Sequence, residues 1–331
     1  MKKYDYDILG IGNAVTDIFV EVEQSFLDNN ELTEGTMKLV DEESINELLK
    51  GLHISQTLAG GSVANSLSTI AKLGGSCGFI GNRKNDKYGK LFTKSMEEYN
   101  IRLFNKESME GKASSICLVL VTPNGERTMC TYLGASTKLD KNNLNLEDLK
   151  KSNVVYLEGY LFDLPEAKEI FYQVVENSKE LGYKVAISLS DPFCVERHRE
   201  DFLKLIKKKI DILFANESEI ESLFGCKTEE ALKTAGENID IAIATLGEKG
   251  SLLYNQNSYI ASEAFPANAL DTTGAGDNYA AGFLYMYVKN AALGDCMKAG
   301  SLCASETIKI LGARPKCDLN FLLLENNILK N

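Results

Sequence analysis

Short apolar runs alternate with helical patterns through the middle of the chain, and this alternation restricts the possible folds more than any other feature. Strand-like runs lie at residues 154–157, 184–189, 210–215 and 239–245, and helix-like patterns separate them at 165–181, 194–207 and 217–224. Strands joined through helices pair in parallel, and the helices cover both faces of the resulting sheet. The sequence therefore predicts an α/β fold around a mostly parallel sheet.

The composition excludes several classes of partner. The chain has 331 residues, 44% of them hydrophobic and 25% charged, which is enough for one large domain. Its formal net charge of −11 argues against a nucleic-acid partner. No apolar run approaches the roughly 18 residues of a membrane helix, and residues 1–7 hold no signal core. The eight cysteines are scattered without C-x-x-C pairs, so we expect a reduced, cytoplasmic protein.

Two regions depart from the alternating pattern and predict a second, smaller sheet. Near the start of the chain, residues 18–22 and 37–40 have the character of short strands. Further on, residues 115–122 and 127–132 flank the turn sequence Pro-Asn-Gly-Glu at 123–126. Asn-Gly between apolar runs is a strong hairpin signal. We expect the hairpin to pair with the first region and form a lid.

A glycine-rich stretch at 271–277, Asp-Thr-Thr-Gly-Ala-Gly-Asp, is the strongest candidate for a functional site. It leads into a helical pattern, so its small residues lie at the start of the predicted helix. Unpaired N–H groups and the positive end of the helix dipole point to this place, which suits an anion. A carboxylate at Asp277 would repel a bound phosphate, but it could accept a proton from an attacking hydroxyl. The alternative is an ordinary helix start, with a threonine cap and Asp277 as a first-turn acid.

Three other motifs offer polar or glycine-rich turns beside predicted strands or helices. Asn216 and Glu219 follow a strand and suit either Mg²⁺ or a helix cap. Thr245 begins a loop with glycines at 247 and 250, which suits either a flat ligand or an ordinary hairpin. The Gly60–Gly61 pair precedes a helix of small residues, where the backbone must bend or approach another group closely.

Taken in this order, the motifs resemble the ribokinase-type (PfkB) family of carbohydrate and nucleoside kinases along nearly the whole chain. Residues 271–277 resemble its second signature, and Gly-Gly-Ser-Val-Ala-Asn at 60–65 resembles its first, in which the paired glycines are a hinge. Residues 216–219 are similar to its N-x-x-E metal motif, and residues 245–247 to its nucleotide loop.

This resemblance implies one ribokinase-like domain over residues 1–331. Its fold would be a three-layer α/β/α arrangement with a mostly parallel central sheet and a small β-sheet lid. The lid would be formed from about 14–40 and 112–134.

The resemblance also implies transfer of the γ-phosphoryl group of ATP to a substrate hydroxyl. Asp277 would be the general base, and the amides of Gly274, Ala275 and Gly276 would stabilise the transferring phosphate. Asn216 and Glu219 would position Mg²⁺, mainly through water, and the family allows a monovalent cation such as K⁺ near Asp271. The implied substrate-binding residues are Asn13, Asp17, Gly60, Gly61, Asn65 and Arg127. The implied nucleotide-binding residues are Thr245, Gly247, Gly250, Thr272, Gly274 and Gly276.

Within the family, the substrate is expected to be a ribonucleoside. Residues 12–18 look most like the start of adenosine kinases, and 125–128 and 188–193 fall where similar stretches occur there. Tyr160 and Phe162 are candidates for contact with the base. A sugar kinase acting on ribose or fructose is the alternative, and a sensor that binds nucleotide or sugar without catalysis is a further one. Both a monomer and a homodimer agree with the sequence.

Overall fold

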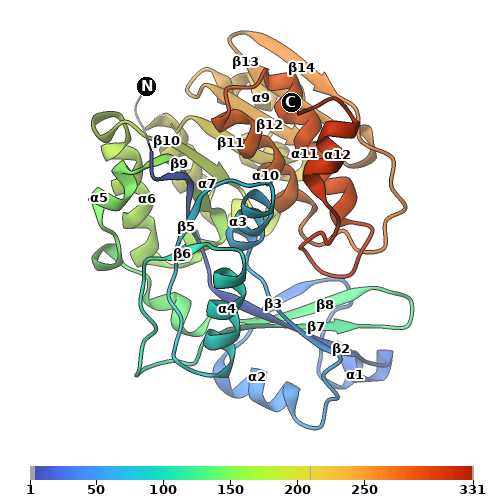
Figure 1. Ribbon diagram of the computed structural model, residues 1–331. Helices are drawn as coiled ribbons and strands as arrows, with labels where there is room; N and C mark the ends of the chain where they lie inside the picture. Colours follow the sequence, from blue (N-terminus) through green and yellow to red (C-terminus); the bar gives the residue numbers. More distant parts are fainter. Residues whose placement is uncertain (1–3, 209, 330–331) are drawn as a thin grey trace.

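Nine strands form one sheet through the larger part of the molecule in the computed structural model, which describes residues 4–208 and 210–329 (Figure 1). Pairing is parallel from β12 to β6, and β13 and β14 add an antiparallel edge. In spatial order the strands are β14 (Ser258–Ser262), β13 (Ser251–Asn255), β12 (Ile241–Thr245), β11 (Ile212–Asn216), β10 (Lys184–Ser188), β9 (Ser152–Glu158), β1 (Tyr6–Ile11), β5 (Cys77–Ile80) and β6 (Arg102–Leu103).

Helices cover both faces of this sheet, because successive strand residues point to opposite sides. In β1, Ile8 packs into one core cluster and Leu9 into the other, and Val154 and Val155 of β9 divide in the same way. The Ile8 face is covered by α3 (Ser62–Lys72), α4 (Lys87–Glu98), α10 (Ala275–Val288), α11 (Leu293–Thr307) and α12 (Leu319–Glu325). The Leu9 face is covered by α5 (Leu146–Lys150), α6 (Pro165–Leu181), α7 (Pro192–Lys207), α8 (Glu217–Phe224) and α9 (Thr228–Gly236).

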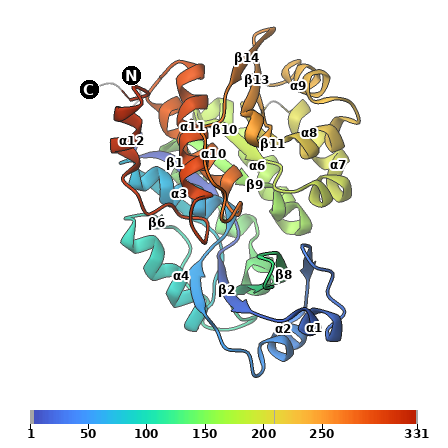
Figure 2. The same ribbon diagram turned by 90° about the vertical axis from the view of Figure 1, so that its right-hand side faces the viewer.

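A second, five-stranded sheet lies beside the first, below it in Figures 1 and 2. One face packs on α1 (Gln24–Asn29) and α2 (Glu42–Leu49), and the other carries a small apolar cluster of Val15, Phe19, Cys117 and Val119. The sequence did not indicate β4, which pairs with β2 at the edge. In spatial order the strands are β3 (Met37–Leu39), β8 (Arg127–Tyr132), β7 (Ser115–Val121), β2 (Val15–Glu21) and β4 (Gln56–Ala59).

The order of the strands brings the carboxyl ends of several of them to one place. The chain leaves β1 for the second sheet and later returns to form β5 on one side of β1 and β9 on the other. Connections that diverge in this way leave a crevice at the carboxyl ends of the two strands. Asn13, just after β1, and Glu158, the last residue of β9, face each other there.

Close packing of two helices fixes the position of the glycine-rich stretch. A Cβ atom on Gly282 of α10 would lie 2.4 Å from the carbonyl oxygen of Ala299 in α11, so only glycine allows the helices to approach this closely. The start of α10, with Asp277 in its first turn, is therefore anchored to the body of the molecule.

Among the described residues, no helix combines the length and apolar character needed to cross a bilayer. Residues 1–3, part of the stretch in which the sequence shows no signal core, lie outside the described part of the chain.

Candidate active site

A cavity of about 570 Å³ lies between the two sheets, at the carboxyl ends of the parallel strands. Its floor includes Asn13, Glu158, Asn216 and Thr245 at the strand ends, together with the loop at 272–277. Apolar residues of the second sheet line the opposite side. A larger hollow, of about 1190 Å³, adjoins Lys184 and Asp211 near the other ends of the strands and contains none of the predicted site residues.

Asp277 lies half-buried in the cavity wall and is held by the first turn of α3. Ser62 Oγ donates to its Oδ1 at 2.6 Å, and Asn65 Nδ2 donates to its Oδ2 at 3.1 Å. Burial raises the pKa of this carboxyl, although both hydrogen bonds and the charge of Arg314 oppose the rise. A carboxylate that holds a proton more tightly than usual is the stronger base.

Arg314, which no sequence motif indicated, controls the orientation of Asn65. Its Nε donates to Asn65 Oδ1 at 3.1 Å and its Nη1 donates to Ser95 Oγ at 2.7 Å. Because the amide oxygen of Asn65 faces the guanidinium, the amide nitrogen must face Asp277. Burial lowers the pKa of Arg314 to about 10, so the group remains a cation at neutral pH.

Asp17 of β2 lies close to the same cation. Burial raises its pKa to about 7; the charge of Arg314 opposes the rise and that of Asp277 adds to it. A Cβ atom on Gly60 would lie 2.2 Å from Asp17 Oδ2, so the carboxylate requires a glycine there. Gly61 has a φ of +91°, and a Cβ atom on it would lie 2.4 Å from the carbonyl oxygen of Asn13. The paired glycines therefore allow two close approaches at the site.

Asn13 and Glu158 form a buried pair across the ends of β1 and β9. Asn13 Nδ2 donates to Glu158 Oε1 at 2.6 Å, and the N–H of Val63 donates to Oε2 at 3.2 Å. Burial raises the pKa of Glu158 to about 7. Asn13 Oδ1 is buried and has no hydrogen-bond partner among the residues that the structure describes, and Asn13 lines the cavity, so this oxygen offers an acceptor to a ligand hydroxyl. Sequence reasoning missed Glu158.

The loop before α10 leaves room for an anion. Gly274 has a φ of +76° and is the N-cap, and a Cβ atom on Gly276 would meet nothing within 4 Å. Asp271 holds the loop from behind, accepting from the N–H of Thr273 at 2.8 Å and from that of Gly312 at 2.7 Å. Open space beside the start of a fourteen-residue helix fits a phosphate group.

Arg127, the first residue of β8, joins the second sheet to this loop. Its Nη1 donates to Thr273 Oγ1 at 2.9 Å and also forms an ion pair with Asp271. Arg127, Gly60 and Gly250 are not among the residues that line the cavity. Gly250 is a turn glycine, because a Cβ atom there would lie 2.0 Å from the carbonyl oxygen of Ser262.

Asn216 and Glu219 bond to each other at the start of α8. Asn216 Oδ1 accepts from the N–H of Glu219 at 2.8 Å, and Glu219 accepts from the N–H of Asn216 at 2.9 Å and from its Nδ2 at 2.8 Å. This is a capping box, yet both residues also line the cavity, and burial raises the pKa of Glu219 to about 7. Each carboxylate oxygen keeps a lone pair, so the pair fits a hydrated Mg²⁺ better than a directly bound one.

The two aromatic candidates differ in position. Tyr160 lines the cavity, and its hydroxyl donates to the carbonyl oxygen of Ser190 at 3.3 Å. Phe162 is fully buried against Phe171 and Phe202, with ring centroids 5.0 and 4.3 Å away. The expectation that Phe162 contacts a base is therefore wrong, because its ring is part of the hydrophobic core.

Comparison with known proteins matches residues 35–318 to the description "pfkB family carbohydrate kinase". The chain belongs to the PfkB family. A probable sugar kinase from Rhizobium etli CFN 42 is 33% identical, with a TM-score of 0.92 over 98% of this chain and 100% of that one. An adenosine kinase from Sinorhizobium meliloti is also 33% identical, with a TM-score of 0.90 over 97% and 99%. Adenosine kinase 2 of Arabidopsis thaliana is 25% identical over 94% of this chain and 96% of its own length.

These similarities establish the coarse activity. The fold is the ribokinase-like α/β fold expected from the sequence. The PfkB protein is a phosphotransferase, a sugar or nucleoside kinase similar to adenosine kinases, and its family implies the use of ATP. The comparisons therefore favour an enzyme over a sensor that binds without catalysis.

The carboxyls of Asp17, which is half-buried, and Glu158, which is fully buried, predict a pH-dependent stability. Both have a pKa raised to about 7, whereas in an unfolded chain the pKa of such carboxyls is about 4. The folded protein then binds these protons more tightly than the unfolded chain. The free energy of unfolding should therefore fall as the pH rises from about 4 to about 7, by at most ~1.4 kcal/mol per pH unit for each group. Above this range it should level off.

Denaturant unfolding of the ligand-free protein across this pH range measures the slope of the unfolding free energy against pH. Asp17→Asn should reduce it, because the variant has no proton to lose at that position. Glu43→Gln, which removes an exposed carboxylate from the first turn of α2, is the matched control and should leave the slope unchanged. An equal slope in wild type and Asp17→Asn would contradict the prediction.

Proposed function

We propose that this PfkB kinase transfers the γ-phosphoryl group of ATP to a hydroxyl of a ribonucleoside, with an adenosine-like nucleoside as the acceptor. The observation that carries the proposal is the uneven lining of the cavity. Asn13, Asp277 and the loop at 272–276 form a polar side, whereas Val15, Phe19, Cys117, Val119 and Met129 of the second sheet line the opposite side, where Asp17 is the charged residue of an otherwise mostly apolar face. The flat apolar face of a nucleobase suits such a wall, whereas the hydroxyls of a sugar buried there would lose their hydrogen bonds to water.

Asp277 is proposed as the general base. Ser62 and Asn65 fix its carboxylate, and burial raises its pKa, which strengthens it as a proton acceptor. Asp17 and the unpartnered Asn13 Oδ1 would hold the ribose hydroxyls and direct one of them toward Asp277. The amides of Gly274, Ala275 and Gly276 at the start of α10 would stabilise the charge of the transferring group.

The second sheet is proposed to act as a lid over the reacting groups. Arg127 reaches from β8 to Thr273 and Asp271. The β7–β8 hairpin is therefore in contact with the loop at 271–276, which we call the phosphate loop. Closing the cavity in this way would exclude water, which would otherwise compete with the substrate hydroxyl for the phosphoryl group. Gly60 and Gly61, between β4 and α3, are the proposed hinge.

ATP supplies the phosphoryl group, and Mg²⁺, when bound, neutralises part of its charge. Thr245, Gly247, Thr272 and the loop at 274–276 line the cavity and are proposed to hold the nucleotide, whereas Gly250 shapes the turn behind them. Asn216 and Glu219 are proposed to orient the water shell of Mg²⁺. Asp271, the expected neighbour of a monovalent cation, already accepts from Thr273 and Gly312, so the proposal includes no such ion.

A substrate panel tests the proposed acceptor. Adenosine, inosine, guanosine, ribose and fructose are each assayed for ADP formation with ATP and Mg²⁺. We expect a nucleoside to give a kcat/KM at least tenfold above that of either sugar, about 1.4 kcal/mol in transition-state binding. The names of the relatives include both adenosine kinases and fructokinases, so the sugars are a real alternative. A sugar that is tenfold better than every nucleoside would overturn the proposal.

Asp277→Asn tests the general base. The substitution keeps the size of the side chain but removes the proton acceptor, so kcat should fall by about 10²- to 10⁴-fold while ATP binding survives. Asp295→Asn is the matched control, because Asp295 is also a first-turn carboxylate, in α11, and does not line the cavity. If Asp277 served only the helix dipole, both variants would lose roughly 0.3–1 kcal/mol of stability and keep normal turnover.

Glu219→Gln tests the proposed metal site. Removing this charge should raise the Mg²⁺ concentration that gives half-maximal rate, with little change in the affinity for the acceptor. Glu217→Gln removes an exposed carboxylate from the same first turn and should leave the Mg²⁺ dependence unchanged. Identical Mg²⁺ profiles for wild type and Glu219→Gln would leave Asn216 and Glu219 as a helix cap only.

A further inference from the structure

Asp163 is a charged residue at the cavity wall with no role in the chemistry described above. It is the last residue of the short helix η3 (Gly159–Asp163), which begins directly after β9 and also carries Tyr160. Asp163 lines the cavity, and its side chain is only 14% exposed. No motif of the sequence indicated it.

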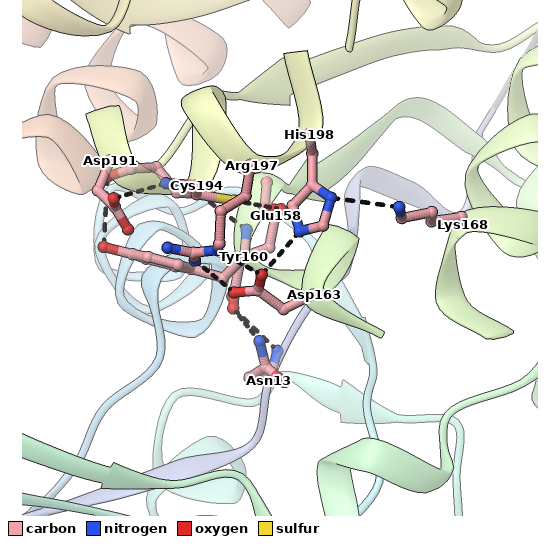
Figure 3. Close-up of polar contacts among 11 residues, drawn as sticks. Asn13, Glu158, Tyr160, Asp163, Lys168, Asp191, Cys194, Arg197 and His198 are labelled. Atoms are coloured by element: carbon pink, nitrogen blue, oxygen red, sulfur yellow. Dashed lines mark hydrogen bonds and ion pairs between the residues drawn. The ribbon is translucent and has the colours of Figure 1, made fainter. Parts of the chain in front are cut away.

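Two basic residues of α7 fix the orientation of this carboxylate. Arg197 Nε donates to Asp163 Oδ1 at 3.1 Å and its Nη2 donates to Oδ2 at 2.8 Å. His198 Nε2 lies 2.7 Å from Oδ1. Figure 3 shows dashed lines that join Asp163 to both of these side chains. A fork of this kind holds a carboxylate in one plane.

The imidazole of His198 is itself held in place. His198 has non-helical backbone angles, φ −124° and ψ 24°, inside α7. Lys168 Nζ lies 3.2 Å from His198 Nδ1 and 2.6 Å from Asp201 Oδ2. Because an ammonium group only donates, Nδ1 is the acceptor, and Nε2 carries the hydrogen that is donated to Asp163. The contacts of Lys168 thus make His198 a donor to Asp163.

Counting donors leaves one acceptor position on Asp163 free. Oδ1 already accepts from Arg197 and His198, whereas among the described residues Oδ2 accepts from Arg197 alone, and each oxygen can accept about two hydrogen bonds. Burial raises the pKa of Asp163, but the hydrogen bonds from Arg197 and His198 outweigh it, so the pKa is lowered overall. Asp163 therefore brings to the cavity wall an anionic carboxylate whose Oδ2 keeps an unused lone pair.

We infer that Asp163 determines which base the enzyme accepts, because its free Oδ2 lone pair accepts an N–H from the base of the bound nucleoside. An ionised carboxylate attracts an amino group or a ring N–H and repels a ring nitrogen that has only a lone pair. The inference rests on the proposed nucleoside function and names the chemical class within it: bases with an N–H donor at the edge that faces η3.

The position of Asp163 agrees with such a role. Tyr160, on the same short helix, presents an aromatic ring at the cavity wall, and the apolar side chains of the second sheet lie across the cavity. Asp277 and the phosphate loop belong to α10, on the Ile8 face of the main sheet, whereas η3 contacts α6 and α7 on the Leu9 face. A nucleoside with its ribose at Asp17 and Asp277 could therefore extend its base toward Asp163.

Two nucleosides that differ only in the donor test the inference. Adenosine carries a 6-amino group, and purine riboside has the same rings without it. Their dissociation constants are measured by calorimetry in the absence of ATP, and their kcat/KM values in its presence. We expect the wild type to favour adenosine by tenfold or more in both measurements. Equal affinities of the wild type for the two ligands would overturn the inference without any variant.

Asp163→Asn then tests the residue. The amide oxygen should take the place of Oδ1 and accept from Arg197 and His198, which puts the NH₂ group in the place of Oδ2. The cavity-facing group changes from acceptor to donor, so the preference for adenosine should disappear or reverse. Asp201→Asn is the matched control, because Asp201 belongs to the same polar network through Lys168 and Tyr172 but does not line the cavity. It should keep the wild-type preference.

The possible results separate this inference from the proposed function. If the wild type phosphorylates sugars and no nucleoside, the proposed function fails. If nucleosides are substrates but Asp163→Asn keeps the wild-type preference, or Asp201→Asn loses it equally, only the role of Asp163 is overturned.

Discussion

The site depends on the burial of several carboxylates around one buried guanidinium. Asp17 belongs to strand β2 of the second sheet and Asp277 to helix α10, yet both interact with the charge of Arg314. A buried carboxylate without a counter-charge would take up a proton, and its hydrogen bonds would change with it. Arg314 limits this tendency by its charge and also fixes the amide of Asn65, which in turn holds Asp277. One cation thus supports two elements of the site.

Two other carboxylates of the site, Glu158 and Glu219, are stabilised by hydrogen bonds more than by a counter-charge. Glu158 accepts from Asn13 and from the N–H of Val63, so it joins β1, β9 and the start of α3. Glu219 accepts from Asn216 at the start of α8. For both, burial dominates and the pKa rises to about 7. These groups hold strand and helix ends together at the cavity.

The two sheets supply different halves of the cavity. The main sheet brings polar strand ends together because its strands are parallel and its connections diverge at β1. The second sheet contributes alternate residues of its strands. On the side of the cavity these are mostly apolar, with Asp17 as the charged exception, and on the other side they pack on α1 and α2. Arg127 crosses from the second sheet to the phosphate loop. The division into a polar floor and an apolar wall therefore follows from the alternation of side chains along each strand.

The sequence by itself determined the features that depend on local pattern. Alternating strands and helices from residue 154 to 245 predicted the parallel sheet, Asn124–Gly125 predicted the β7–β8 hairpin, and the glycines at 274 and 276 marked the start of α10. These patterns arise from side-chain periodicity and backbone freedom, which act over a few residues. Tertiary structure alone decided which distant side chains meet. Arg314 contacts Asn65 across 249 positions, Glu158 contacts Asn13 across 145, and Asp163 is held by residues 34 and 35 positions away. No local pattern distinguishes such a buried charge from a surface one, because the partner that stabilises it is set by the packing of separate elements. The same is true of Phe162, whose place in the core depends on the neighbouring helices and not on the short segment that contains it.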